Sequence, residues 1–206
     1  MNAPNPPLPL GYSPVPPGHI ANVVTCLEML RRPETVAAGG FPPPYRLVPV
    51  STPDITAYRA LFRKIGERWM WFSRLIMPEA ELAAILHDPK VEVYVLRDGD
   101  ADVGLLELDF RQDRECELAF LGLAEHAIGK GLGGALMAAA IATAWARPIE
   151  RFWVHTCHFD HPGAVGFYIH AGFRPYAYQV EVQVDPRLTG HLPRHAAPHV
   201  PLIGPA

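Results

Sequence analysis

The feature that most constrains this chain is a glycine-rich stretch between an apolar segment and a helix-forming segment. The stretch is Ile128–Gly134, with the sequence IGKGLGG. It follows the apolar run Leu118–Leu123, which predicts a strand, and it opens Leu132–Ala146, which predicts a helix poor in bulky side chains. A helix N-terminus carries unpaired N–H groups and a positive dipole end, and glycines let a phosphate approach them. This order of elements favours a pyrophosphate site.

Glycines alone do not define such a site, because they also serve tight turns and close packing of helices against sheets. The stretch is not a P-loop, since Lys130 precedes the last glycines and Ala135 follows them. A dinucleotide fingerprint is disfavoured because it normally follows the first strand of its unit, whereas this loop comes late in the chain. Glu150 does lie near the distance at which that fold places its acid, so the loop's position alone argues against it.

The glycine stretch resembles the acetyl-CoA loop of the GNAT superfamily of N-acetyltransferases, whose pattern is Gln/Arg-x-x-Gly-x-Gly/Ala. Ile128–Gly133 occupies that pattern, preceded by Leu121-Gly122-Leu123 at the spacing of the family's strand. About thirty residues further on, Ala164–Phe173 matches a second family element, Ala-x-x-x-Tyr-x-x-x-Gly-Phe. The resemblance covers roughly Tyr45–Asp185 and implies an N-acetyltransferase that uses acetyl-CoA (CoA).

The composition is that of an ordinary globular protein. The chain has 206 residues, of which 49% are hydrophobic, and a formal net charge of -3, so it can bury a core in one domain with extensions. Slight acidity disfavours nucleic acid as a partner, and no apolar run approaches the ~20 residues of a membrane span. The proline-rich start lacks the regions of a signal peptide, so we expect a cytoplasmic protein without a membrane partner. Three separated cysteines, Cys26, Cys116 and Cys157, predict buried thiols.

Proline-rich segments divide the chain into three expected parts. Residues 1–44 form an N-terminal extension with prolines at both ends, and residues 186–206 form a Pro- and His-rich tail on the surface. Residues 45–185 form the acetyltransferase domain. Within the extension, the β-branched and apolar residues of His19–Leu30 predict a strand. We expect this strand to complete a sheet edge, in the same chain or in a second copy of a homodimer.

Residues 45–185 predict alternating strands and helices. The expected strands are Tyr45–Val50, Val91–Leu96, Val103–Phe110, Cys116–Leu123, Arg151–Thr156 and Tyr176–Val184. The expected helices start at Ser51-Thr52-Pro53-Asp54 with a capping hydroxyl, at Pro78, at Leu132 and at Pro162. This order predicts an α/β (α+β) fold, GNAT-like, with a mixed, mostly antiparallel sheet and helices on both faces.

Two residues are candidates for proton transfer. Acetyl transfer from a thioester to an amine needs a neutral nucleophile, a stabilised oxyanion and a proton for the leaving thiolate. The resemblance puts Tyr168 at the family's general-acid tyrosine, and a phenol pKa of ~10 keeps it protonated. Glu117 is the candidate base, because it starts the strand that enters the loop and apolar neighbours would raise its pKa. A packed tyrosine without a role and a strand-end salt bridge are the structural alternatives.

The resemblance also implies the contacts to the cofactor. The backbone of Leu121 and Leu123 would face the pantetheine amides, and residues 129–133 would face the pyrophosphate. The candidate cofactor residues are Leu121, Leu123, Ile128, Gly129, Lys130, Gly131, Leu132, Gly133, His161 and Phe167. The chain departs from the family at Ile128, where Gln or Arg is usual, and at His161, where many members have an asparagine. Asp160 is a candidate N-cap for the helix of Tyr168.

A third group of residues could contact the acceptor amine. The candidates are Trp71, Phe72, Arg74, Glu107 and Asp109. The two aromatic residues lie where the family often forms its acceptor wall, although core packing explains them equally well. The arginine could bind an acidic acceptor group. Glu107 and Asp109 either join Glu117 or point away from it, depending on the hairpin register, and if they join it the pocket attracts cationic amines.

Histidines and cysteines near residue 157 raise the question of a metal. The group comprises His155, Cys157, His158, Asp160 and His161. His155 and Cys157 alternate along a predicted strand, and no second ligand pair stands at zinc-site spacing, so we expect no metal.

The sequence thus favours an N-acetyltransferase that transfers an acetyl group to a small-molecule or peptide amine by direct attack. The alternative from another class is a non-catalytic acyl-CoA-binding sensor or assembly module with the same fold. The presence of both Tyr168 and Glu117 favours the enzyme. Polyamines, aminoglycosides, amino acids and protein amines all remain open as acceptors.

Overall fold

A single mixed sheet forms the centre of the computed structural model, which describes residues 7–34 and 40–204. The first six residues of the expected extension, residues 35–39 of its proline-rich linker and residues 205–206 of the tail lie outside the described residues. The strand order is β2-β3-β4-β5-β6-β1-β7. Neighbouring strands are antiparallel except β5 and β6, which are parallel.

The elements follow the predicted order from residue 45 onward. The strands are β1 (His19–Met29), β2 (Tyr45–Val50), β3 (Val91–Asp98), β4 (Ala101–Asp109), β5 (Glu115–Leu123), β6 (Arg151–Cys157) and β7 (Arg174–Val184). The α-helices are α1 (Ile55–Gly66), α2 (Ser73–Ile76), α3 (Glu79–Leu86), α4 (Leu132–Ala144) and α5 (Ala164–His170). Two 3-10 turns, η1 (Glu67–Trp69) and η2 (Glu125–Ala127), and α2 were not predicted, because they are too short for a periodic pattern.

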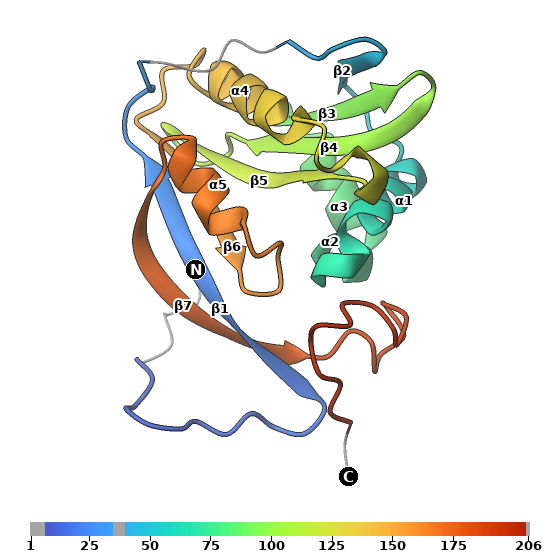
Figure 1. Ribbon diagram of the computed structural model, residues 1–206, viewed down its shortest axis with the longest axis vertical. Helices are drawn as coiled ribbons and strands as arrows, with labels where there is room; N and C mark the ends of the chain where they lie inside the picture. The colour runs from blue at the N-terminus through green and yellow to red at the C-terminus, as the bar shows by residue number, and fades with distance from the viewer. Residues whose placement is uncertain (1–6, 35–39, 205–206) are drawn as a thin grey trace.

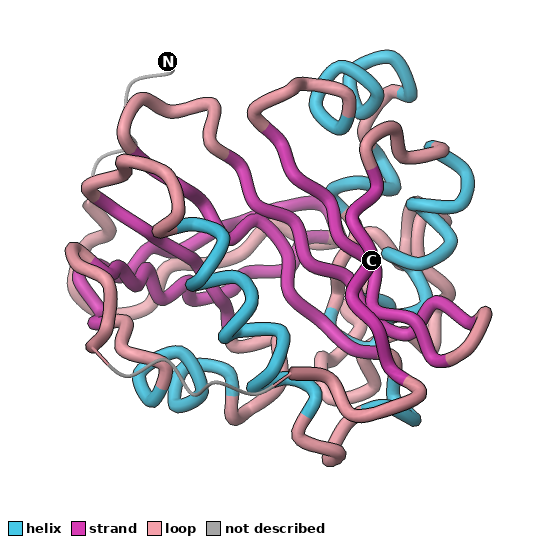
Figure 2. Tube along the Cα trace, turned by 90° about the horizontal axis from the view of Figure 1, so that it is seen from above, coloured by secondary structure: helices cyan, strands magenta, loops and turns pink. Residues whose placement is uncertain are grey.

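Helices cover both faces of the sheet, which confirms the predicted fold class (Figures 1 and 2). Helices α4 and α5 pack on one face, where Leu136 and Tyr168 meet strand residues such as Leu106 and Phe152. Helices α1 and α3 pack on the other face through Phe62 and Leu82, against β3, β4 and β5. The second group of helices covers only one end of the sheet, so no helix of residues 7–34 and 40–204 covers the strands β6, β1 and β7 on this face (Figure 1).

Strand β1 lies inside the sheet, between β6 and β7, so the expected placement at a sheet edge was wrong. Its register pairs Val24 with Cys157 on β6 and with Gln179 on β7. Buried side chains such as Leu27 and Met29 anchor it in the core. The edge strand is β7, and the expected boundary at residue 45 separates strands that hydrogen-bond within one sheet.

Helix α1 begins at Ile55, later in the chain than the sequence suggested. Asp54 is its N-cap, and the side-chain carboxylate accepts a hydrogen bond of 2.8 Å from the backbone N–H of Ala57. The expected capping hydroxyl of Ser51 or Thr52 was therefore wrong. A carboxylate serves this position well because it also interacts favourably with the positive end of the helix dipole.

The tail after β7 packs onto the body of the protein. Leu192, Ala197 and Val200 are buried in a cluster with Met70 and Phe159. An ion pair of 2.7 Å between Arg187 and Asp185 is buried beneath it, and the same guanidinium donates to the carbonyl oxygens of residues 196, 200 and 201. The tail thereby closes the end of the molecule below α2 (Figure 1). None of the helices in the described part of the chain has the length and apolar composition to span a bilayer.

Candidate active site

The strands β5 and β6 separate after a short parallel ladder. Their pairing covers only Glu115–Glu117 against Arg151–Trp153, although both strands continue beyond these residues. A cavity of about 680 Å³ opens where they diverge, lined by Leu118–Leu123 on one side and Val154–Cys157 on the other. Since β5 still pairs with β4, its backbone groups on the β6 side remain available to a ligand in this gap.

The glycine loop and the start of α4 lie beside this cavity. Gly131 is the N-cap of α4 with a left-handed φ of 77°, and no side chain of the described residues caps the helix. Gly129 also has a positive φ, of 82°. A Cβ added at Gly129, Gly131 or Gly134 would meet nothing within 4 Å, so these glycines leave open space at the helix start. The first N–H groups of α4 are therefore accessible to an anion, which fits a pyrophosphate.

The candidate cofactor residues divide into two groups. The cavity wall includes Leu121, Leu123, Ile128, Gly133, His161 and Phe167. The others, Gly129, Lys130, Gly131 and Leu132, lie on the loop next to it. Lys130 donates a hydrogen bond of 3.1 Å from Nζ to the hydroxyl of Tyr45, and the side chain of Leu132 is buried in the core. At Leu132 only the backbone can contact a ligand.

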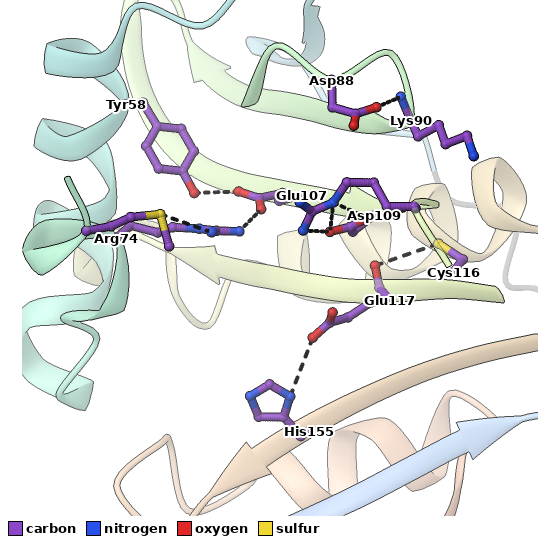
Figure 3. Close-up of polar contacts among 11 residues, drawn as sticks. Tyr58, Arg74, Asp88, Lys90, Glu107, Asp109, Cys116, Glu117 and His155 are labelled. Atoms are coloured by element: carbon purple, nitrogen blue, oxygen red, sulfur yellow. Dashed lines mark hydrogen bonds and ion pairs between the residues drawn. The ribbon is translucent and has the colours of Figure 1, made fainter. Parts of the chain in front are cut away.

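Glu117 lies at the point where β5 and β6 part, and its side chain lines the cavity. Burial, together with the nearby carboxylate of Asp109, raises the pKa of Glu117 from 4.5 to about 7. On the opposite strand, Nδ1 of His155 lies 3.6 Å from Oε1 of Glu117 (Figure 3). A carboxyl group with this pKa exchanges its proton close to neutral pH, which is the property required of a general base.

The carboxylates of β4 face Glu117, but each already has a cationic partner. Glu107 is fully buried and accepts hydrogen bonds of 2.5 Å from both Tyr58 and Arg74. Asp109, opposite Glu117 in the register, pairs with Arg111 at 2.6 Å (Figure 3). The guanidinium of Arg74 is therefore paired with Glu107, while its Nε has no hydrogen-bond partner among the described residues and is left for a group of the acceptor.

Tyr168 reaches the cavity from the other side of the gap. Its side chain projects from α5, is 9% exposed and packs edge-on against Phe167 and Phe173. Burial and the neighbouring Asp160 raise the pKa of Tyr168 above its ordinary value. The phenol therefore stays protonated at neutral pH and can donate a hydrogen bond to a group in the cavity.

Asp160 holds the loop before α5, and the expectation that it caps this helix was wrong. Its carboxylate accepts hydrogen bonds from Trp71 Nε1 at 2.9 Å, from Thr156 Oγ1 at 2.7 Å and from the backbone of Cys157 at 2.9 Å. The N-cap of α5 is Gly163, without a side-chain cap. The carboxylate faces back toward β6 because three donors converge there, which outweighs the single bond that an N-cap would make.

The aromatic residues after α1 line the cavity, and one of them also packs against other aromatic side chains. Trp71 and Phe72 line the cavity. The indole of Trp71 also packs against Phe62 and Phe120, with ring centroids 5.4 Å and 5.2 Å apart. A Cβ on Gly122 would come within 2.9 Å of this indole, so glycine on β5 permits the close approach. The sequence left open whether these aromatic residues form a wall of the acceptor site or pack in the core, and Trp71 does both.

Several cavity residues had no signal in the sequence analysis. Asn22 and Glu181 line the cavity from β1 and β7, and Arg111 lines it from the turn after β4. Their positions depend on pairings between distant strands, so only the alternating polar residues of β7 could have suggested that one face is lined by polar groups. Among the described residues, no group of three or more His, Cys, Asp or Glu side chains is arranged to hold a metal ion.

Comparisons with known proteins identify the family and the fold. Residues 58–173 match the model of the Acetyltransferase (GNAT) family. Similar solved structures include a GNAT-family acetyltransferase from Novosphingobium aromaticivorans (17% identity, TM-score 0.57, covering 82% of this chain and 68% of that one). A GCN5-related N-acetyltransferase from Sphaerobacter thermophilus is also similar (17% identity, TM-score 0.59, covering 84% of this chain and 53% of that one). So is one from Kribbella flavida (18% identity, TM-score 0.52, covering 84% of this chain and 63% of that one). This chain thus spans 53% to 68% of those proteins, and at such identities the likeness establishes the fold. None of the curated proteins matches the chain.

Proposed function

Because the chain belongs to the GNAT family of acetyltransferases, we propose that it is an acetyl-CoA-dependent N-acetyltransferase acting on a primary amine. The observation that carries the proposal is the cavity at the strand separation, which brings the half-buried carboxyl of Glu117 and the phenol of Tyr168 to one space beside the glycine loop. A small-molecule or peptide amine is the proposed acceptor. Direct attack of the amine on the acetyl group requires both partners in this one cavity.

The glycine loop and β5 provide the surface for acetyl-CoA. Bound there, acetyl-CoA supplies the thioester acetyl group. The open N–H groups at the start of α4, beside Gly131 and Gly133, would hold the pyrophosphate. The free edge of β5 at Leu121 and Leu123 would bind the amide groups of the pantetheine arm. Ile128 in place of Gln or Arg is compatible with this site, because backbone groups would make most of the contacts.

Glu117 would prepare the nucleophile. An aliphatic ammonium cannot attack, so it must first lose a proton to a group near it. The carboxylate of Glu117 lines the cavity, and its pKa of about 7 lets it accept that proton at neutral pH. His155, 3.6 Å away and half exposed, faces solvent at the same place.

Tyr168 would serve the leaving group. Formation of the C–N bond and breakage of the C–S bond leave a thiolate, which needs a proton or a hydrogen bond. The buried phenol of Tyr168 remains protonated and reaches the cavity from α5. Glu117 and Tyr168 come from opposite sides of the strand gap, so one group can take a proton while the other donates one.

A panel of amines tests the proposal. Release of CoA from acetyl-CoA would be followed for polyamines, aminoglycosides, amino acids and peptides, with the wild-type protein and Tyr168→Phe. We expect turnover with at least one class, and about a tenfold lower kcat in the variant with unchanged affinity for acetyl-CoA. A wild-type protein that binds acetyl-CoA tightly but acetylates no amine would instead be an acyl-CoA-binding module.

A further inference from the structure

The cavity extends from Glu117 along the helix-free face of β6, β1 and β7. Its far end is lined by Asn22 on β1 and by Glu181 and Gln183 on β7. Asn22 pairs directly with Glu181 in the β1–β7 register, and its Nδ2 donates a hydrogen bond of 2.9 Å to Oε2 of that carboxylate. The amide of Asn22 thus fixes the orientation of Glu181.

At this end of the cavity, one buried hydrogen-bond acceptor has no donor among the described residues. Asn22 is only 3% exposed, and its Oδ1 has no hydrogen-bond partner among the described residues. Such an oxygen costs free energy until a donor reaches it. Within residues 7–34 and 40–204, Glu181 is in no ion pair, whereas Arg74 and Arg111 are already bound to carboxylates. The group that would satisfy this end is therefore a cation carrying N–H donors.

The distance from Asn22 to the place of acetyl transfer beside Glu117 can be estimated from the strand geometry. His155, beside Glu117, pairs with Cys26 on β1. Asn22 lies four residues further along the same strand and on the same face, so at ~3.4 Å per residue its Cα is ~14 Å from that of Cys26, and Glu181 lies beside it on β7. A linear ligand that reaches from Glu117 to Glu181 must therefore separate its two nitrogens by roughly 14 Å.

We propose that the acceptor is a linear diamine or polyamine whose second ammonium group binds Glu181 and Asn22 while its first is acetylated beside Glu117. The inference rests on the proposed function and adds the class of substrate. A single amine would leave Oδ1 of Asn22 without a donor and the exposed carboxylate of Glu181 facing solvent. A second ammonium supplies an N–H donor for that oxygen and a positive charge beside that carboxylate.

The test measures binding of 1,8-diaminooctane and of n-octylamine to the protein saturated with CoA, by calorimetry, where no turnover occurs. The variants are Glu181→Gln, which removes the charge, and Asp113→Asn, an exposed control away from the cavity. We expect the wild type and the control to prefer the diamine about fivefold, and Glu181→Gln to bind both amines alike. Acetylation rates in a series of diamines should peak at about eight to eleven carbons, the lengths whose extended chains bracket the spacing of roughly 14 Å.

Several results would overturn the inference. They are equal affinity of the wild type for the two amines, binding of neither amine, or an equal loss for both amines in Glu181→Gln. Acetylation of monoamines without any preference for diamines would reject this inference and leave the proposed function standing. Preferential binding of the diamine without acetylation would reject the proposed function and leave the second cation site standing.

Discussion

The two walls of the cavity are built in different ways. The glycine wall, residues 121–134, consists of one strand and one helix start that are adjacent in the sequence, and its ligand groups are backbone N–H and C=O groups. The composite wall combines residues 69–74 with β1, β7 and the tail, and its ligand groups are side chains such as those of Arg74, Asn22 and Glu181.

Because of this difference, the glycine wall can recognise a ligand that a whole family shares, whereas the composite wall can select an acceptor specific to one chain. Backbone groups recognise an anion regardless of the side chains beside them, so the glycine wall suits a ligand common to many proteins. Side chains fix charge and shape, so the composite wall determines which acceptor enters. The buried pairs Arg74–Glu107 and Asp185–Arg187 hold the segments of this wall in place.

The largest expected effect comes from removing β1 from the composite wall. Deletion of residues 1–30 removes β1, and β7 then loses its pairing partner in the sheet. Buried side chains of β1, among them Leu27 and Met29, each stabilise the fold by ~1.5–3 kcal/mol, and their sum with the lost ladder approaches the whole stability of a domain, ~5–15 kcal/mol. We expect an insoluble protein without a cooperative melting transition.

A shorter deletion is the control for this experiment. Removing residues 1–17 takes away no residue of the sheet, so the melting temperature should change by less than about 2 °C. Calorimetric melting of both truncated proteins measures the difference. If deletion of residues 1–30 left a folded protein with the wild-type melting temperature, β1 would be a passive addition to the sheet.

Strand β1 shows which features of the fold could be predicted from the sequence. The strand itself was predicted from its β-branched residues, but its partners on β6 and β7 lie more than a hundred residues later in the chain. Periodicity describes which face of a strand is buried and carries no information on which distant strand pairs with it. The glycine wall was predictable because strand, loop and helix follow one another within residues 118–144.

The same limit applies to single side chains. Glu117 and Tyr168 were predicted as cavity residues because each lies close to a local motif. The partners that define their surroundings, Asp109 for Glu117 and Asp160 for Tyr168, depend on a hairpin register with a bulge and on a loop with three converging donors. Neither geometry follows from spacing along the chain.

The next largest effect is expected at Glu117. Glu117→Gln should lower kcat/KM at pH 8 by about a hundredfold, because the amine must then lose its proton without a base. In the wild type, kcat/KM should fall about tenfold per pH unit below pH 7, as the carboxylate with a pKa of about 7 becomes protonated. The variant should lack this limb. The pH–rate profiles of the two proteins on one acceptor measure both effects.

Stability provides a test of the same pKa that does not depend on activity. The folded protein disfavours the ionised form of Glu117, whose pKa rises from 4.5 to about 7, so the carboxylate destabilises the fold increasingly between those pH values. Glu117→Gln should therefore equal the wild type in melting temperature at pH 4 and exceed it at pH 8. A variant that is less stable at pH 8 would show that Glu117 is a structural acid.

A smaller effect, confined to the glycine wall, is expected at Gly131. Valine there must adopt a φ near 77°, which is strained for a side chain with a branched Cβ, and its methyl groups would occupy the open space at the start of α4. Gly131→Val should weaken CoA binding about thirtyfold and leave pantetheine binding unchanged. Calorimetry with both ligands measures this. Gly134→Ala, inside the helix with equal open space, is the control, and unchanged CoA affinity in Gly131→Val would exclude the loop as the pyrophosphate site.

The smallest effect is expected where the composite wall meets the loop of Tyr168, at Trp71. Trp71→Phe keeps an aromatic ring against Phe120 but removes the hydrogen bond from Nε1 to Asp160, while Asp160 keeps its other two donors. A hydrogen bond contributes ~1 kcal/mol, so the melting temperature should fall by about 2–4 °C. Because Trp71 lines the cavity, KM for the acceptor should rise about threefold while CoA affinity stays constant.

Trp153→Phe is the matched control for this substitution. Nε1 of Trp153 is buried without a partner among the described residues, so its removal costs no hydrogen bond and relieves an unsatisfied donor. We therefore expect a smaller fall in melting temperature than for Trp71→Phe, and no change in KM, since Trp153 is not part of the described cavity wall. Equal losses of stability in both variants, with KM unchanged, would mean that Trp71 acts only by filling space and that its hydrogen bond to Asp160 does not position the loop before α5.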